Sequence, residues 1–241
     1  MLHKLTAIVL HTKKYRESSL LAYVYTNLFG RQAYVVNGVR SGKNKTGMAF
    51  FQPLTLLDAV AYHNPKSELQ RLGEYRLLQP LHSIPFTVNK NALALFIGEV
   101  LYKTIREHEP NDGLFRFLVR AVLDLDGLTQ GVSNFHLYFL VHLNRYLGYA
   151  PGNNYFSETP YFDAQAGEFT PLRPTHDLFF DTTQTQLFAT LLNSKPENLA
   201  QLSLHHDQRN RFVDNMLRFL NHHFDTPVAV RSAAILQEVF R

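Results

Sequence analysis

A ten-residue loop near the N-terminus gathers three glycines and three cations with no acid among them. Its sequence is Gly38-Val-Arg40-Ser-Gly42-Lys43-Asn-Lys45-Thr-Gly47. Glycine lets backbone N–H groups come close to a phosphate, and arginine and lysine supply the Coulomb attraction. The spacing is not that of a P-loop, GxxxxGK[ST]. The composition therefore favours contact with phosphates over an ordinary solvated loop.

A second group of cations, Lys13, Lys14 and Arg16, flanks a candidate turn at 15–19, and closure of a barrel would bring it near this loop. Aromatic residues are interleaved with both groups. Basic grooves follow the phosphates of single-stranded nucleic acid, and aromatic faces stack its bases at about 1–3 kcal/mol per base. For any single ring, packing in a barrel core is the favoured alternative. The predicted nucleic-acid contacts are Lys13, Lys14, Tyr15, Arg16, Arg31, Tyr34, Arg40, Lys43 and Lys45.

The twelve histidines form no recognisable catalytic or metal-binding motif. The pairs 205–206 and 222–223 are adjacent, so on a helix their side chains point about 100° apart and cannot easily share a metal. The sequence lacks HExxH, GxSxG and a strand followed by GxGxxG, and Asp124-Leu-Asp126 is an isolated carboxylate pair. We predict no catalytic residue, no bound metal and no cofactor.

The positive charge of the chain is concentrated in its first eighty residues. Residues 1–80 contain eleven Lys and Arg against four acids, a net +7, whereas the rest has thirteen against sixteen, a net −3. A basic module joined to a mildly acidic body typically binds a polyanion, most often nucleic acid. The same division predicts two domains, 1–80 and 81–241.

Several protein classes are excluded by composition. The chain has no cysteine, which rules out disulfides, thiolate metal sites and a cysteine nucleophile. No run approaches the roughly twenty apolar residues of a membrane span. The first ten residues are too short an apolar stretch, and too soon followed by charge, for a secretory signal. We expect a soluble cytoplasmic protein, associated with the nucleoid and with no membrane partner.

Five segments rich in β-branched and aromatic residues predict strands in the first eighty residues. They are 5–12, 20–26, 32–36, 54–63 and 69–78, with Gly, Asn and Pro between them. Five short strands suit a small closed barrel, because closure removes exposed sheet edges. The OB-fold is the five-stranded barrel most often used on nucleic acid, and an SH3-like barrel is the alternative.

After residue 80 the hydrophobic period becomes helical. It predicts helices around 93–105, 114–122, 135–147 and 212–224, and a last one over 228–240 that Thr226-Pro227 would start. Residues 152–181 lack this period and predict an irregular insertion, in which 161–169 could form a hairpin. The predicted fold is therefore α+β and multidomain: an N-terminal five-stranded OB-fold barrel, then an all-α helical domain with a loop or hairpin insertion.

Seven short pieces of the sequence, taken together and in order, resemble one known family. They are Thr6-Ala-Ile-Val-Leu-His-Thr12, Tyr15-Arg-Glu-Ser-Ser-Leu20, Tyr25-Thr26 with Phe29-Gly30-Arg31, Asn37-Gly-Val-Arg40, Gln52-Pro-Leu-Thr-Leu-Leu57, Glu74-Tyr-Arg-Leu-Leu-Gln-Pro80 and Tyr146-Leu-Gly-Tyr-Ala-Pro151. This set resembles the RecO family of bacterial recombination mediators and strand-annealing proteins, over nearly the whole length.

The resemblance implies an N-terminal OB-fold, a C-terminal α-helical domain, and binding of both single- and double-stranded DNA. It also implies partnership with RecR, and docking of the helical domain on the acidic C-terminal tail of the single-stranded-DNA-binding protein. That tail presents a carboxylate and apolar side chains, so its site should combine a cation with an apolar pocket. The candidate cations are Lys103, Arg106, Arg116, Arg120 and Arg145.

Many members of this family carry a four-cysteine zinc motif in the region after the position of Pro151. The corresponding segment here, 152–181, contains no cysteine. We expect aromatic packing to hold the segment in place of the metal. The aromatic residues concerned are Tyr155, Phe156, Tyr161, Phe162 and Phe169.

The resemblance implies a non-enzymatic function in DNA repair and homologous recombination. Such a protein would anneal complementary strands and, with RecR, help to load a recombinase onto coated single strands. The alternatives are a metal-dependent nuclease that uses His and Asp residues, an RNA-binding barrel protein, and a scaffold that binds only proteins.

Overall fold

The computed structural model describes residues 1–41, 47–152, 154–156, 158–224 and 227–241. The chain divides into two compact units, Met1–Gly127 and Leu128–Arg241. The first two helices after the barrel therefore group with the barrel in the first unit. That residues 1–80 form a domain of their own stays a prediction.

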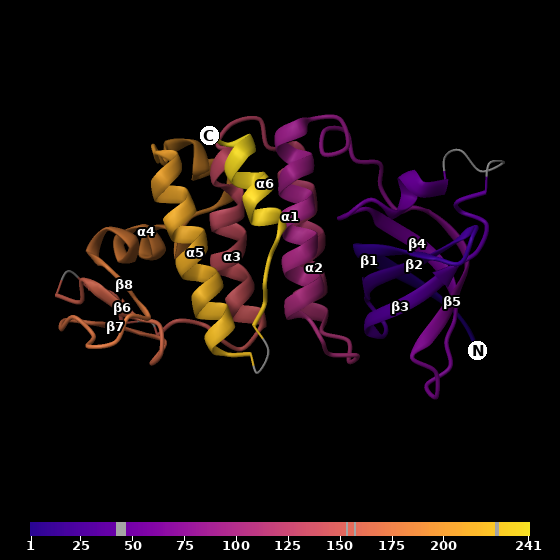
Figure 1. The fold of residues 1–241 in the computed structure, drawn as a ribbon, viewed down its shortest axis with the longest axis horizontal. Helices are drawn as coiled ribbons and strands as arrows, with labels where there is room; N and C mark the ends of the chain where they lie inside the picture. Colours follow the sequence, from indigo (N-terminus) through magenta and orange to yellow (C-terminus); the bar gives the residue numbers. More distant parts are fainter. Residues whose placement is uncertain (42–46, 153, 157, 225–226) are drawn as a thin grey trace. The chain divides into compact units, whose positions relative to one another are not determined.

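Five strands of the first unit close into a barrel in the order β1-β2-β3-β5-β4 (Figure 1). The strands are β1 (Leu2–Tyr15), β2 (Ser19–Thr26), β3 (Gly30–Val36), β4 (Leu56–Tyr62) and β5 (Leu69–Leu77). Neighbouring strands run antiparallel except β3 and β5, which run parallel. The predicted five-stranded OB-fold is confirmed, in place of the SH3-like alternative.

Side chains at alternate strand positions fill the barrel, as the pleat of a strand requires. On β1, Leu5, Ala7 and Val9 belong to the barrel core, whereas Ile8 and Leu10 are buried on the outer face. Helix α1 (Val88–Thr104) packs against this strand. The approach is close: a Cβ built on Gly98 of α1 would lie 2.7 Å from the carbonyl oxygen of Leu10.

Replacing Gly98 with alanine should destabilise the first unit by about 1–3 kcal/mol, because the added methyl group must push α1 away from β1. The matched control is Gly127→Ala at the end of α2 (Asp112–Gly127), where a Cβ meets nothing within 4 Å. That change should be neutral or stabilise by up to about 1 kcal/mol. Urea unfolding followed by far-ultraviolet circular dichroism measures both effects. Equal midpoints for the two variants would contradict the close packing of α1.

Asp126, near the end of α2, fixes the segment that leads from the barrel into α1. Its carboxylate accepts hydrogen bonds of 2.7–2.9 Å from the backbone N–H groups of residues 82–84. Burial raises the pKa of Asp126, but these backbone bonds outweigh burial and hold the pKa below its ordinary value. The Lys90 ammonium donates to the Asp126 carbonyl at 2.7 Å, and Asp124 pairs with Arg120 at 2.8 Å. The isolated carboxylate pair of the sequence is therefore engaged in structural contacts.

In its described residues, the second unit combines the α-helices α3 to α6 with a small sheet of order β7-β6-β8 (Figure 1). Its elements are α3 (Phe135–Tyr146), β6 (Tyr161–Asp163), β7 (Glu168–Thr170), β8 (Phe179–Phe180), α4 (Thr182–Leu192), α5 (His206–His222) and α6 (Ser232–Val239). The predicted hairpin at 161–169 is confirmed, with Gly167 at φ +73° in its turn. None of the helices in the described ranges is both long and apolar enough to cross a bilayer.

The sequence-based prediction was wrong at the start of the last helix, which begins at Ser232 rather than near Val228. The backbone N–H of Val228 donates to the side chain of Asn221 in α5. This contact holds the chain at Val228 against α5, so the helix begins only at Ser232. Thr226, the predicted start, lies outside the described residues. Strand β8 and helix α4 were not predicted.

Phe162 of β6 lies at the centre of the second unit's aromatic core. Its ring centroid is 4.8–5.6 Å from those of Phe169, Phe180, Phe188 and Phe219. These rings come from the sheet and from both α4 and α5, so the sheet is held against the helices by phenylalanine packing. The ring centroids of Tyr155 and Phe169 are 5.1 Å apart, and those of Tyr161 and Phe179 are 6.2 Å apart. Phe156 is 63% exposed, so its predicted role in this packing is wrong.

Candidate nucleic-acid interface

Arg40, from the first predicted group of cations, contacts the β1–β2 turn that carries Arg16 of the second group. The backbone N–H of Arg40 donates to the carbonyl of Ser18 at 3.0 Å. Its guanidinium donates to the carbonyl oxygens of Arg16 and Glu17 at 3.2 and 3.3 Å. The loop after β3 is thus fastened to the β1–β2 turn, as expected from closure of the barrel. The predicted contacts Lys43 and Lys45 lie outside the described residues.

Lys13, Lys14, Arg16 and Arg40 together are called the barrel cation surface. Lys13, Lys14 and Arg16 are exposed, and the Arg16 guanidinium lies 5.4 Å from the centre of the Tyr15 ring. Arg16 has φ +55°, the left-handed conformation of a tight turn. Within the described part of residues 1–80, Arg76 alone forms an ion pair with a carboxylate. The cations of the barrel cation surface are therefore not neutralised by acids of the described chain.

Next to Lys13, the ring of Tyr102 on α1 collects aromatic and cationic side chains from three strands. Lys13 donates to the Tyr102 hydroxyl at 3.2 Å. The rings of His11 and Tyr23 lie 4.6 and 4.8 Å from the Tyr102 ring, and the Arg31 guanidinium lies 4.7 Å from it. Burial, followed by the charge of Lys13, lowers the pKa of His11 and so favours its neutral ring. Partly exposed rings beside cations suit base stacking next to phosphate contacts.

The sequence could not have identified the Tyr102 cluster, because Tyr102 comes from a helix about ninety residues after Lys13. Strand alternation does place His11 and Lys13 on one face of β1, but it gives no indication of which helix covers that face.

Two predicted contacts have different roles in the structure. Tyr34 is fully buried inside the barrel, where burial raises the pKa of its hydroxyl. The prediction that Tyr34 contacts nucleic acid is wrong, because it shares the inward face of β3 with Val36. Arg31 is half-buried, and its guanidinium donates to the carbonyl of Ile105 at 2.8 Å, so it also fixes the chain that follows α1.

The outer face of β1, β4 and β5 carries both signs of charge. A hollow of about 400 Å³ there is lined by Lys4, Asp58, Glu74 and Arg76, and Asp58 pairs with Arg76 at 2.6 Å. Two carboxylates beside two cations give phosphate no net attraction. The electrostatics of the barrel therefore favour the barrel cation surface as the phosphate site.

The five cations predicted for a peptide site have different surroundings. Lys103 pairs with Glu99 at 3.0 Å, and Arg120 with Asp124 at 2.8 Å. Arg116 is exposed on α2, and Arg106 lies beyond the end of α1.

Arg145, at the end of α3, lines a hollow of about 460 Å³ in the second unit. The apolar walls of this hollow include Pro151, Tyr155, Phe169 and Leu192. We call this feature the Arg145 hollow. It joins a cation with apolar walls, the combination expected for the tail of a partner.

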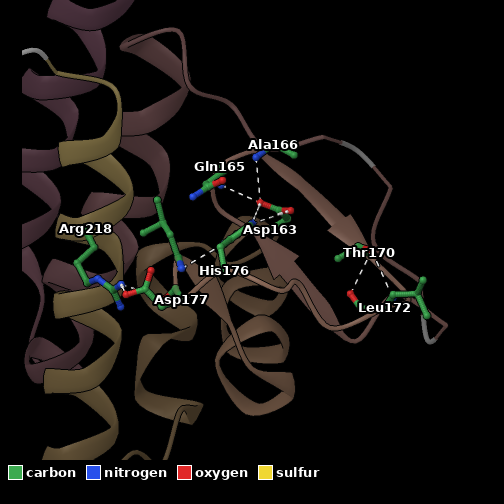
Figure 2. Close-up of polar contacts among 9 residues, drawn as sticks. Asp163, Gln165, Ala166, Thr170, Leu172, His176, Asp177 and Arg218 are labelled. Atoms are coloured by element: carbon green, nitrogen blue, oxygen red, sulfur yellow. Dashed lines mark hydrogen bonds and ion pairs between the residues drawn. The ribbon is translucent and has the colours of Figure 1, made fainter.

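Figure 2 shows how polar contacts fasten the insertion. The Asp163 carboxylate accepts hydrogen bonds from the backbone of residues 165–166 and from His176. Burial raises the pKa of Asp163, but these bonds outweigh it and lower the pKa below its ordinary value. Arg218 of α5 donates at 3.0 Å to both the carbonyl and the carboxylate of Asp177. Side chains of the insertion thus bond to one another and to α5.

The residues of the insertion do not fit the thiolate zinc motif that the resemblance implies. The chain has no cysteine. Among the residues that the structure describes, no three or more His, Asp or Glu side chains are grouped so that they could hold a metal ion. Phenylalanine packing and the contacts of Asp163 and Arg218 hold the insertion in the region where the family's zinc motif would lie.

Comparisons with known proteins give the same family for the N-terminal and the C-terminal part of the chain. The family model described as "Recombination protein O N terminal" matches residues 1–81, and "Recombination protein O C terminal" matches residues 85–232. A protein of Flavobacterium psychrophilum named DNA repair protein RecO is 34% identical over 98% of both chains. Proteins of the same name from Bacteroides fragilis and Phocaeicola vulgatus are 33% and 31% identical over 100% of both chains. The chain therefore belongs to the RecO family of DNA repair proteins.

Proposed function

We propose that this protein is a non-enzymatic mediator of DNA repair and homologous recombination that binds DNA through its barrel. The observation that carries the proposal is the barrel cation surface, whose four cations come from the end of β1, the β1–β2 turn and the loop fastened to that turn, and have no carboxylate partner in the described chain. Neutralising phosphates releases condensed counterions, and this term does not depend on base sequence. The surface therefore suits both single- and double-stranded DNA, and the Tyr102 cluster adds stacking for unpaired bases.

Strand annealing follows from this binding without covalent chemistry. Two complementary strands repel each other through their phosphates, and a cationic surface reduces this repulsion while it holds the strands close. We propose that the protein anneals strands in this way and, with RecR, helps to load a recombinase onto coated single strands. Membership of the RecO family supports the proposal.

The Arg145 hollow is the proposed docking site for the acidic C-terminal tail of the single-stranded-DNA-binding protein. A terminal carboxylate can accept hydrogen bonds from the Arg145 guanidinium, and apolar side chains of the tail can pack on Pro151, Tyr155 and Leu192. This contact would bring the protein to strands that are already coated.

Annealing of complementary oligonucleotides, bare and coated with the single-stranded-DNA-binding protein, tests both parts of the proposal. The unaltered protein should accelerate annealing of both. Arg145→Ala should weaken binding of the tail peptide by about tenfold or more, because it removes hydrogen bonds to a charged group. It should slow annealing of coated strands and leave bare strands unaffected.

The matched control is Arg241→Ala, because Arg241 is an exposed arginine of the same unit. It should behave as the unaltered protein. If the unaltered protein does not anneal bare strands, the proposed function is wrong. If Arg145→Ala slows annealing of bare and coated strands equally, the Arg145 hollow is not the docking site for the tail. Cleavage of the strands with Mg²⁺ would favour the nuclease alternative, and tighter binding of RNA than of single-stranded DNA would favour the RNA-binding alternative.

A further inference from the structure

Three arginines surround a second hollow of the second unit, between α5 and the insertion. Its volume is about 430 Å³, within the range of about 300–1,000 Å³ typical of small-ligand sites. Arg211 and Arg218 come from α5, and Arg173 comes from the insertion. Residues 128–241 contain eight Lys and Arg against ten Asp and Glu. Three of those eight cations therefore gather around one hollow of a unit that is acidic as a whole.

Two aspartates on the rim orient two of these arginines without using all their donors. Arg218 contacts Asp177 at 3.0 Å through Nη2 (Figure 2). Arg211 contacts Asp181 at 2.6 Å, also through Nη2, while Asp181 accepts the backbone N–H of Gln184 and so caps α4. The side chains of Arg211 and Asp177 are 63% and 94% exposed, and exposed ion pairs contribute only about 0–1 kcal/mol. A guanidinium has five N–H donors, so both arginines can bind an anion while the aspartates hold them.

The third arginine lies against an aromatic wall. The Arg173 guanidinium is 5.3 Å from the centre of the Phe179 ring, and it has no carboxylate partner in the part of the chain that the structure describes. The Phe179 ring in turn contacts Tyr161 at 6.2 Å. Asn215 of α5 also lines the hollow and offers an amide to a base edge. The hollow thus offers planar guanidinium donors for phosphate and rings for stacking.

We infer that this hollow, called the triple-arginine hollow, binds single-stranded nucleic acid through a phosphate and a stacked base. The inference rests on the proposed function, because it gives the second unit a DNA site of its own in addition to the one proposed on the barrel. Two such sites on one chain would let one molecule hold two strands. An acidic, apolar peptide fits the Arg145 hollow better, because a larger share of its lining is apolar than in the triple-arginine hollow. The triple-arginine hollow instead combines three cations and two carboxylates, a net positive charge, with polar side chains and two rings.

Photocrosslinking of the full-length protein to a thymidine oligonucleotide that contains 5-iodouracil tests the inference. Mass spectrometry should identify crosslinks at Tyr161 or Phe179, in addition to crosslinks on the barrel. Arg173→Gln breaks no ion pair in the described chain, and it should lower the yield at the hollow about tenfold, as expected for loss of a charged hydrogen bond. Arg241→Gln, the matched control, should leave the yield unchanged. Thermal unfolding of both variants checks that they are folded.

The outcomes separate this inference from the proposed function. Barrel crosslinks without hollow crosslinks overturn the inference and leave barrel binding in place. Hollow crosslinks without barrel crosslinks overturn the proposed barrel site and support the inference. The inference is also overturned if Arg173→Gln leaves the yield of crosslinks at the hollow unchanged. It is overturned as well if the hollow binds an acidic peptide and gives no crosslink to the oligonucleotide.

Discussion

Phe162→Ala should destabilise the second unit by about 3–5 kcal/mol, the cost typical of deleting a buried phenylalanine side chain. The ring is fully buried and contacts four other phenylalanine rings, from the sheet, α4 and α5. A loss of this size is a large part of the 5–15 kcal/mol by which domains are typically stable. Urea unfolding, followed by near- and far-ultraviolet circular dichroism, measures the effect.

The same substitution at an exposed phenylalanine gives the control. Phe156 is 63% exposed, so Phe156→Ala should change stability by no more than about 0.5 kcal/mol. Addition of a metal chelator should leave the unfolding of the unaltered protein unchanged, because phenylalanine packing holds the insertion. Similar losses for the two variants, or a lower midpoint with chelator, would show that the aromatic core is not what stabilises this unit.

Replacing Lys13, Lys14 and Arg16 together with glutamine should weaken single-stranded DNA binding by about 10- to 100-fold at physiological salt, because three phosphate contacts are lost. Lys14 and Arg16 are exposed and unpaired in the described chain, and Lys13 is held by the Tyr102 hydroxyl. The stability of the barrel should change little, because these side chains are not part of its core. Fluorescence anisotropy with a labelled thymidine oligonucleotide gives the affinity.

A second triple variant carries the same charge change elsewhere on the barrel. Lys4, Lys66 and Arg71 are replaced with glutamine, and Lys4 lies on the face that also carries Asp58 and Glu74. This control should lose less than about threefold in affinity, because distant exposed charges are largely screened by salt. Equal losses for both variants would mean that net charge, and not the position of the cations, governs binding.

The barrel was predictable from the sequence because its signals are local. Alternation of apolar residues and the glycine, asparagine and proline residues between segments located all five strands within a few residues. A local contact also begins the second helix, because the Asn111 side chain accepts the backbone N–H of Leu114 at 2.9 Å. Local signals failed where a tertiary contact decides the conformation, as at Val228, which bonds to Asn221 in α5.

The candidate site was predictable only in part, because the surroundings of each cation depend on which other segments pack next to it in the fold. The approach of Arg40 to the β1–β2 turn follows from barrel closure, which the strand pattern implies. Tyr34 was assigned to the surface because it is aromatic and near cations, whereas the pleat of β3 turns it inward. Arg211 and Arg218 of the triple-arginine hollow lie on one helix, α5, but Arg173 comes from the insertion, which has no helical period. Their grouping required the structure.

The salt dependence of DNA binding tests the central claim most directly, that cations gathered on the barrel bind phosphates. The logarithm of the binding constant for a single-stranded oligonucleotide is measured against the logarithm of sodium chloride concentration. The account predicts a steep negative slope for the unaltered protein, smaller by about two for the Lys13, Lys14 and Arg16 triple variant, at roughly 0.7 per lost contact with a single strand. The slope of the Lys4, Lys66 and Arg71 control should match that of the unaltered protein. A slope that is the same in all three proteins would contradict the claim.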